Sequence, residues 1–529
     1  MLPNATMLHA APGRAVRSCG LRAATAWLIA CAPLVAMPLA APAQLSQPAW
    51  AGYARNAQHS ALADVASQPL MRIRWQIRVD DNPQYSGSEL LIHYGSPLVT
   101  EANTVIVPVK VRAANRFLVD ARRGSDGSRL WRQQTDYRLP PHDWVPSFSP
   151  TLSPTGKLWI PGGGGTLYYR STIDVRAGAP RQQVAFFGLD NYRRHRSVYL
   201  ANVFINTPLT ADGNGNIFFG FQVTGPTALN LRSGIARVSD DGTGSWVAAA
   251  TAAADPTITK VAHNSAPALS NDGTRLYVAV NDGSGTGGAS GYLLALDSQT
   301  LATVAARRLK DPVSGMDADI HDDGTASPTV GPDGDVYFGV LENPLGTHHS
   351  RGWLLHFNNS LQPQGVPGSF GWDDTASIVP ASMVPSYQGN STYLLMTKYN
   401  NYAEAGGDGV NRIAVIDPNN QMFDPISGAS VMREVLTIRG PTPDPSLVST
   451  LPNAVREWCI NTAVVDPTTQ SILANNEDGK LYRWNLATNT LSETMVLTTG
   501  LGEAYTPTLI GPDGTVYAIN NGILFAVGM

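Results

Sequence analysis

The sequence predicts an all-β protein folded as an eight-bladed β-propeller, with a seven-bladed ring as the alternative. It holds 50 glycines and 38 prolines among 529 residues, and only 15% of its residues are charged, which is typical of a turn-rich β-protein. Apolar residues alternate at period two in short runs, and no long stretch has the helical period. A short pattern also recurs eight times at spacings of about 45 to 60 residues, with one longer unit, which is the length of a four-stranded blade.

The segment "SPTVGPDGDVYFGV", residues 327–340, shows the parts of this repeat. Each copy has a small residue at one of its first two positions, because only small side chains fit where the innermost strands crowd around an axis. Proline at the first strand position costs no ladder hydrogen bond, and Asp-Gly supplies the positive φ of a hairpin turn. The copies begin at Gly95, Phe148, Asn206, Ser265, Ala326, Ala376, Asn461 and Tyr505.

The two ends of the ring are predicted to close on each other. The last copy stops after "GILFAVGM", so it lacks an outer strand, whereas residues 70–80, "LMRIRWQIRVD", read as a strand without a partner. We expect the segment 44–80 to complete the last blade and so remove an open edge. Seven blades would follow if the weak unit "NTAVVD" or "ASIVPA" were not a blade.

Residues 1–43 have the pattern of a secretory signal peptide. Arg14, Arg17 and Arg22 precede an apolar run, and "APA" offers a cleavage site before Gln44. The alternatives are lipoprotein processing at Cys31 and an uncleaved membrane anchor. We therefore expect one propeller domain, residues 44–529, that is periplasmic or secreted and has no transmembrane segment after cleavage.

The mature chain has 34 basic and 41 acidic residues, a net charge of −7, which argues against nucleic acid as a partner. Its one cysteine, Cys459, has no second cysteine with which to form a disulfide inside the chain. The expected partners are a small-molecule substrate or another protein of the cell envelope.

Several segments resemble the tryptophan-docking repeat of quinoprotein-type propellers. They are "FLVDARRGSDGSRLWRQQTD" at 117–136, "RIRWQIRVD" around Trp75, "LLALD" at 293–297, "GKLYRWNLATNTL" from Gly479 and the opening "WAGYARNAQHSA". The resemblance covers nearly the whole mature chain and implies the eight-bladed fold of this superfamily. Its members include dehydrogenases that hold pyrroloquinoline quinone (PQQ) and Ca²⁺ on the axis, and cofactor-free scaffold propellers. The chain departs from the dehydrogenases because it has no adjacent cysteine pair and no matching base aspartate.

Chemistry in a propeller is expected where the loops that precede the inner strands converge. Four histidines lie in these loops, namely His93, His142, His263 and His321. Imidazoles from separate blades can surround one divalent transition metal ion. Carboxylates of the same loops could hydrogen-bond the rings or hold Ca²⁺ themselves, and we take Asp322, Asp323, Asp373, Asp374 and Glu457 as the candidate catalytic groups.

Three functions remain open from the sequence. The first is metal-assisted redox or hydrolytic chemistry on a small molecule at this axial end, and metal-free acid–base chemistry is its variant. The second is a cofactor-free binding or scaffold propeller, in which the same residues only form hydrogen bonds with the backbone of the loops. The third is a PQQ-dependent alcohol or sugar dehydrogenase. No nucleophile elbow, zinc-protease helix or dinucleotide fingerprint is present.

Overall fold

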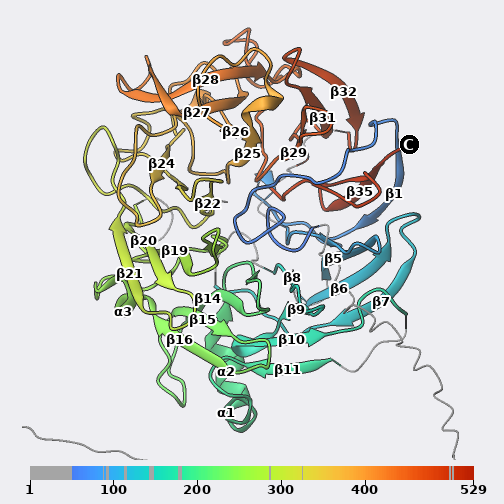
Figure 1. The fold of residues 1–529 in the computed structure, drawn as a ribbon, viewed down its shortest axis with the longest axis vertical. Helices are drawn as coiled ribbons and strands as arrows, with labels where there is room; N and C mark the ends of the chain where they lie inside the picture. Colours follow the sequence, from blue (N-terminus) through green and yellow to red (C-terminus); the bar gives the residue numbers. More distant parts are fainter. Residues whose placement is uncertain are drawn as a thin grey trace, which may run out of the picture. The chain divides into compact units, whose positions relative to one another are not determined.

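Eight antiparallel sheets stand in a ring and form the blades of the propeller (Figure 1). The computed structural model describes residues 50–86, 89–90, 94–111, 116–141, 148–176, 181–284, 288–324, 326–499, 502 and 505–529. Residues Leu45–Met529 form one compact unit. The predicted signal peptide lies outside the described residues and stays a prediction.

The first four blades follow one another along the chain. Blade 1 contains β4 (Leu98–Val99), β5 (Thr104–Val111), β6 (Arg116–Arg123) and β7 (Arg129–Gln134). Blade 2 contains β8 (Thr151–Leu152), β9 (Leu158–Pro161), β10 (Thr166–Arg170) and β11 (Gln182–Ala185). Blade 3 contains β13 (Thr210–Ala211), β14 (Ile217–Val223), β15 (Gly234–Val238) and β16 (Gly244–Ala248), with β12 (Val203–Ile205) also paired to β14. Blade 4 contains β18 (Ala268–Leu269), β19 (Arg275–Asn281), β20 (Gly291–Asp297) and β21 (Thr303–Arg308), with β17 (Lys260–Val261) paired to β19.

The other four blades complete the ring. Blade 5 contains β22 (Thr329–Val330), β23 (Val336–Val340) and β24 (Trp353–Phe357). Blade 6 contains β25 (Ser377–Pro380), β26 (Tyr393–Lys398), β27 (Arg412–Phe423) and β28 (Ser430–Arg439). Blade 7 contains β29 (Val464–Asp466), β30 (Ser471–Asn475), β31 (Lys480–Asn485) and β32 (Thr490–Val496). Blade 8 contains β33 (Leu509–Ile510), β34 (Val516–Asn520), β35 (Ile523–Gly528) and β1 (Arg72–Arg78).

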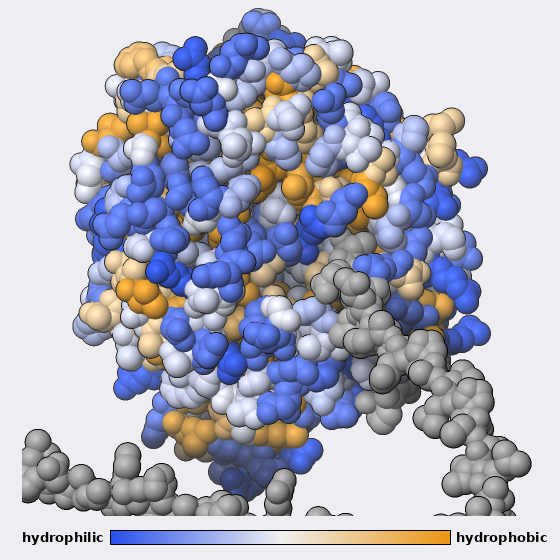
Figure 2. All heavy atoms as spheres, viewed as in Figure 1, coloured by the Kyte–Doolittle hydropathy of each residue, from blue (hydrophilic) through white to orange (hydrophobic). Residues whose placement is uncertain are grey.

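Short elements decorate the blades. A small hairpin joins β2 (Tyr85–Ser86) to β3 (Glu89–Leu90). The described helices are α1 (Leu189–Arg194), α2 (Arg196–Asn202), α3 (Ala249–Ala253), η1 (Gly163–Gly165), η2 (Ala381–Met383) and η3 (Ala403–Ala405). Among the described residues no helix has the length and apolar character to cross a membrane. The face seen in Figure 2 is largely hydrophilic, with smaller hydrophobic patches between.

The predicted repeat is confirmed blade by blade. Each of the eight predicted starts leads directly into an inner strand, so the ring has eight blades rather than seven. The Asp-Gly turns act as expected. In blade 5, Gly334 has a φ of 92°, and the Asp333 carboxylate accepts the Asp335 amide at 3.0 Å.

The N-terminal strand closes the ring as predicted. β1 pairs antiparallel with β35, the last strand of the chain. Trp75 of β1 is 8% exposed, and its ring lies 5.7 Å from that of Tyr517. Its indole Nε1 donates to the backbone oxygen of Gly124 in blade 1 at 2.8 Å. One side chain therefore ties the last blade to the first.

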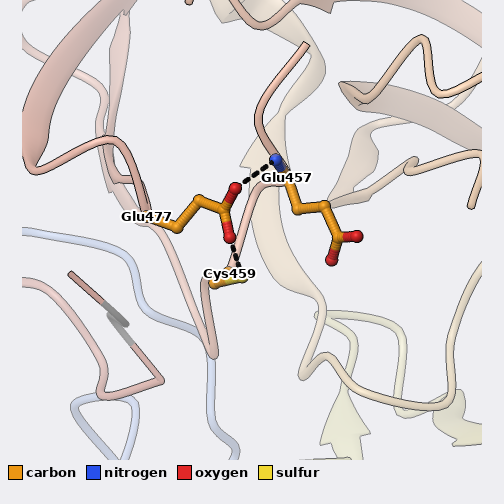
Figure 3. Close-up of side chains that lie close together, drawn as sticks. All are labelled: Glu457, Cys459 and Glu477. Carbon is orange, nitrogen blue, oxygen red and sulfur yellow. Dashed lines mark hydrogen bonds between the residues drawn. The ribbon is translucent and has the colours of Figure 1, made fainter. Parts of the chain in front are cut away.

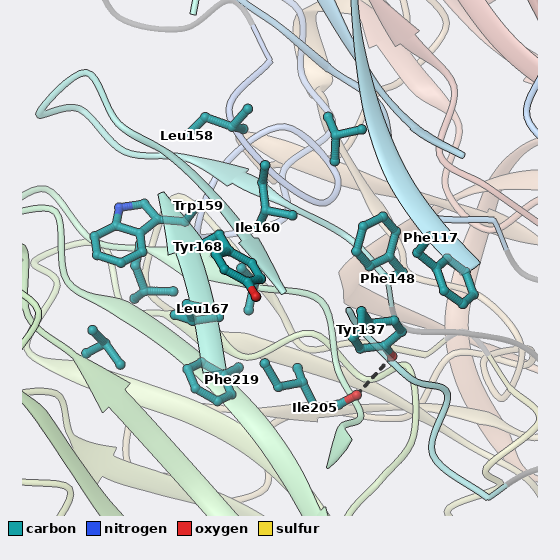
Figure 4. Packing of buried hydrophobic residues seen from close by; sticks show 14 of the residues in the cluster. Phe117, Tyr137, Phe148, Leu158, Trp159, Ile160, Leu167, Tyr168, Ile205 and Phe219 are labelled. Atoms are coloured by element: carbon teal, nitrogen blue, oxygen red, sulfur yellow. Dashed lines mark hydrogen bonds between the residues drawn. The ribbon is translucent and has the colours of Figure 1, made fainter. Parts of the chain in front are cut away.

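Large apolar side chains fill the space between neighbouring blades. Figure 4 shows the cluster between blades 1, 2 and 3, where the rings of Phe117, Tyr137 and Phe148 pack at centroid distances of 5.0 to 5.2 Å. The buried Tyr137 hydroxyl donates to the Ile205 oxygen at 3.0 Å, so its polar end is satisfied. Burial of this kind contributes about 25 cal/mol per Å² of apolar surface and holds the ring together without disulfides.

Small polar residues link the inner strands around the axis. The Ser327 amide donates to the Thr375 hydroxyl at 3.0 Å, and the Thr506 hydroxyl donates to the Tyr94 oxygen at 3.1 Å. A shared small residue at each start therefore lets adjacent blades bond directly. This is the physical reason for the repeated Ser, Thr and Asn in the sequence pattern.

Residues 50–68 form a feature that the sequence did not reveal, which we call the axial strap. The strap lies across the centre of the ring in Figure 1. Its backbone bonds to the inner strands of six blades at Val99, Leu152, Leu269, Val330, Ile378 and Val465. The Tyr53 hydroxyl reaches Thr375 at 2.8 Å and Asn461 at 2.5 Å. The strap therefore closes one end of the axis.

Candidate axial site

The candidate residues lie at the end of the axis opposite the strap. The strap bonds to residues within or at the end of the inner strands, whereas the candidate loops precede the first residues of those strands. The second strand of each blade runs antiparallel to the inner strand, so its C-terminal end reaches the candidate end too. Tyr53 points from the strap toward Thr375, which follows Asp374 directly. It thus forms part of the floor of the site.

Asp322 organises the side of the site formed by blades 4 and 5. The buried carboxylate pairs with Lys260 and accepts hydrogen bonds from the His263 amide at 3.0 Å and the Asn281 side chain at 2.9 Å. Burial alone would raise the pKa of Asp322, but the charges of Lys260 and His263 and these hydrogen bonds lower it to about 2. Asp322 is therefore ionised at every physiological pH.

His321 lies between two carboxylates on the same side. Its Nδ1 is 3.2 Å from Asp319 and its Nε2 is 3.4 Å from Asp323, and its ring meets Trp372 edge-on at 5.4 Å. Burial opposes the charged ring, but the two carboxylates raise the pKa of His321 to about 10. The imidazolium form is thus the stable one at neutral pH, with both nitrogens donating.

Lys398, at the end of β26, organises the side formed by blades 6 and 7. Its ammonium is 2.7 Å from Asp373, and its amide donates to Asp374 at 2.7 Å. All three side chains are buried. Burial raises the pKa of Asp374 to about 7, although Lys398 opposes the shift. Asp374 can therefore hold or release a proton near neutral pH.

Glu457, Cys459 and Glu477 converge beside Lys398. One Glu477 oxygen accepts the Glu457 amide at 3.0 Å, and the other accepts the Cys459 thiol at 3.4 Å (Figure 3). One potential ligand atom from each side chain lies within 4.8 Å of the other two. Glu477 is only 7% exposed, and burial raises its pKa to about 7.

The structure brings the predicted residues together in part. His263 and Asp322 meet, His321 meets Asp323, Asp373 and Asp374 meet at Lys398, and Glu457 meets Cys459. His93 and His142 lie outside the described residues, so the four-histidine metal site stays a prediction. Because His321 is held as a cation, it would have to lose a proton before it could bind a metal ion.

Three residues of the site were missed from the sequence, namely Lys260, Lys398 and Glu477. Lys260 opens β17 beside the last residue of β19, Lys398 ends β26, and Glu477 follows β30, all at the same side of the ring as the candidate loops. For two of them the signal was available in "LLMTKYN" and "LANNEDG", where a polar or charged residue comes at the end of an apolar strand or just after it.

The described residues do not fit the quinone cofactor that the resemblance implies. The two ammonium groups of the site, on Lys260 and Lys398, already form ion pairs with Asp322 and Asp373. They are therefore not available to bind the carboxylates of a quinone. Cys459 is the only cysteine among the described residues, and its chain neighbours are Trp458 and Ile460. A disulfide between adjacent cysteines therefore cannot form there.

The pKa of Asp374 gives a prediction about pH. Its value rises from 3.8 to about 7 on folding, so the folded state binds the proton more tightly than the unfolded state. Stability from this group is present below about pH 4 and is lost as the pH rises to about 7. Asp374→Asn keeps the acceptor for the Lys398 amide but removes this loss. As the pH rises from 4.5 to 8, the free energy of unfolding of the variant should increase by roughly 2–4 kcal/mol relative to that of the wild type. Urea unfolding at each pH measures this difference. Parallel pH profiles of the two proteins would contradict this.

No protein-family model matches the sequence, and no curated protein matches it either. Solved structures do match the fold. One is a europium-containing methanol dehydrogenase, with a TM-score of 0.52, 9% identity, and coverage of 89% of this chain and 90% of that chain. Another is the quinohemoprotein alcohol dehydrogenase from Comamonas testosteroni, with a TM-score of 0.50, 12% identity, and coverage of 90% and 76%. At these identities the likeness concerns the fold alone. The chain therefore has an eight-bladed β-propeller fold similar to the fold of these two structures.

Proposed function

We propose that this chain is an exported propeller that binds a divalent metal ion at its axial end and uses it in chemistry on a small polar molecule. The observation that carries the proposal is the convergence of Glu457, Cys459 and Glu477, whose ligand atoms lie within 4.8 Å of one another. Two of the three side chains are buried, and the third is partly exposed. A site of this kind can hold an ion and still leave one side open to a ligand.

The donor atoms favour an ion of intermediate hardness, such as Zn²⁺. A thiolate is a soft ligand and carboxylates are hard ones, a mixture that suits Zn²⁺ better than Mg²⁺ or Ca²⁺. When bound, such an ion acts as a Lewis acid toward a carbonyl or a water molecule. This favours hydrolytic over redox chemistry, since Zn²⁺ does not change its oxidation state.

The surrounding residues can supply the proton transfers. Asp374 has a pKa of about 7 and is the candidate general base or acid. Lys398 bonds both Asp373 and Asp374 and would orient them. In the neighbouring loop before blade 5, the ionised Asp322 and the cationic His321 offer fixed charges to a polar substrate. The histidine set of His93, His142, His263 and His321 is the alternative ligand set.

The test is elemental analysis of the mature protein, purified from the envelope fraction without chelators or a His-tag. We expect about one divalent ion per chain in the wild type, and less than about a tenth of that in Cys459→Ser and in Glu477→Gln. The exposed His195→Ala serves as the matched control and should keep the ion.

Other outcomes assign other functions. An ion that survives Cys459→Ser but is lost from His263→Ala would overturn the Glu–Cys–Glu set and favour the histidine set. A single Ca²⁺ that survives Cys459→Ser would also overturn thiolate ligation. A metal-free protein that co-purifies with envelope proteins would replace the proposal with a scaffold propeller.

A further inference from the structure

A second candidate site lies far from the axis, at the outer part of blades 5 and 6. β27 and β28 lose register between Asp417 and Gln421, so residues 418–420 bulge out of the sheet. Bulges are frequent next to functional sites because they re-aim side chains. Two hollows flank the bulge, with volumes of about 380 and 470 Å³, and both are lined by Asn420. We call the two hollows together the bulge groove.

A buried aspartate holds the polar side chains of the bulge in place. Asp417 is fully buried and accepts the Tyr387 hydroxyl at 2.5 Å and the Asn420 amide at 2.6 Å. It also accepts the Ser391 hydroxyl at 2.6 Å, and Ser391 in turn accepts the Asn419 side-chain amide at 3.1 Å. Both exposed asparagines are therefore fixed through their amide nitrogens, which leaves their carbonyl oxygens available as acceptors.

A buried acceptor without a partner lies in the wall of the smaller hollow. His356 is 5% exposed, and its Nε2 lies 2.8 Å from Asp335. Burial lowers the pKa of His356 although Asp335 opposes this, so the ring is neutral and its Nδ1 carries a lone pair. That Nδ1 has no hydrogen-bond partner among the described residues. It faces Gly365, where an added Cβ would lie 3.6 Å away.

The chemistry of the lining defines the ligand. Polar side chains line much of both hollows, and the ring of Tyr387 offers a partly exposed apolar surface. Among the ionisable groups, the carboxylates of Asp335, Asp417 and Glu434 outnumber the one cation, Arg433. The ligand should therefore carry many hydrogen-bond donors and no negative charge, with an apolar face that can stack on a ring.

We propose that the bulge groove binds a neutral saccharide, held by the carbonyl groups of Asn419 and Asn420 and stacked on Tyr387. Hydroxyl groups donate to the fixed acceptors, and the C–H face of a sugar ring packs on the aromatic ring. Because the side chains are held before binding, little rotamer entropy is lost when a saccharide binds. The proposal is independent of the metal site.

The test uses the full mature chain on an array of neutral and uronic-acid glycans, followed by calorimetric titration of the best neutral glycan. We expect Asn419→Ala/Asn420→Ala to weaken binding at least about tenfold. Gly365→Ala should also weaken it, because the methyl group fills the hollow beside His356. The matched control Asn214→Ala, an exposed asparagine of a blade 3 turn, should bind like the wild type.

The folding of each variant is checked by thermal unfolding, since Gly365 has a φ of 48° that alanine adopts less readily. If Gly365→Ala does not fold, the binding affinity of Asn419→Ala/Asn420→Ala alone tests the saccharide site. No binding to any neutral glycan on the array overturns the proposal, and so does a double variant that binds within about twofold of the wild type. Retained glycan binding in Cys459→Ser separates this site from the metal site.

Discussion

Lys398→Met is expected to lower the free energy of unfolding by about 3–5 kcal/mol. The ammonium of Lys398 is buried and forms an ion pair with Asp373 at 2.7 Å, and its backbone bonds Asp374. Methionine keeps the apolar length of the side chain but leaves the two buried carboxylates without their cation. Removing one partner of a buried pair costs more than the pair itself contributes, because the other charge stays desolvated. Urea unfolding at pH 7 measures the loss.

Two further variants isolate the charge effect. Asp373→Asn/Lys398→Met removes both partners and should recover at least about half of the lost stability. Lys310→Met breaks a pair with Asp317 in which the lysine is half exposed, so it should cost less than about 1 kcal/mol. If Lys398→Met is as stable as Lys310→Met, the site is not the desolvated ionic cluster described above.

Trp75→Ala is expected to cost about 3–5 kcal/mol, the second large effect. The substitution removes an indole that packs on Tyr517 and lies against Gly127, and it leaves the Gly124 oxygen without its donor. Because Trp75 joins the last blade to the first, the loss acts on ring closure itself. Limited proteolysis should then cut before or within β1 sooner than in the wild type.

Gln76→Ala is the matched control, because Gln76 is the exposed neighbour of Trp75 in the same strand. It should change stability by less than about 0.5 kcal/mol and leave the proteolysis pattern unchanged. Equal effects of the two substitutions would mean that the ring does not depend on the N-terminal strand.

The fold could be predicted from the sequence because each feature of the repeat is required by local structure within a single blade. Small residues at the inner strands, Asp-Gly turns and period-two alternation are each required within one blade, so each blade carries the pattern independently. The strap was not predictable in this way. Residues 50–68 have no periodic pattern, and their bonds to Val99, Leu269 and Val465 depend on a ring that must already exist.

The candidate axial site stays a prediction, but the structure shows which of its residues come together. His263, Asp322, Asp373, Asp374 and Glu457 were found because they precede inner strands. Lys260, Lys398 and Glu477 lie outside these loops, and their roles depend on partners that folding brings to them from the same blade or the next one in the ring. The protonation of His321 depends on Asp319 and Asp323 together, which is a property of the folded loop rather than of residue type.

The central claim is a metal ion between Glu457, Cys459 and Glu477, and anomalous diffraction tests it most directly. Crystals of the mature protein, prepared without chelators, would be measured on both sides of the absorption edge of the ion found by elemental analysis. The account predicts one anomalous peak within bonding distance, about 2.3 Å, of the Cys459 sulfur and beside the Glu477 carboxylate. A peak at His263 or His321 instead, or no peak at the axial end, would contradict it.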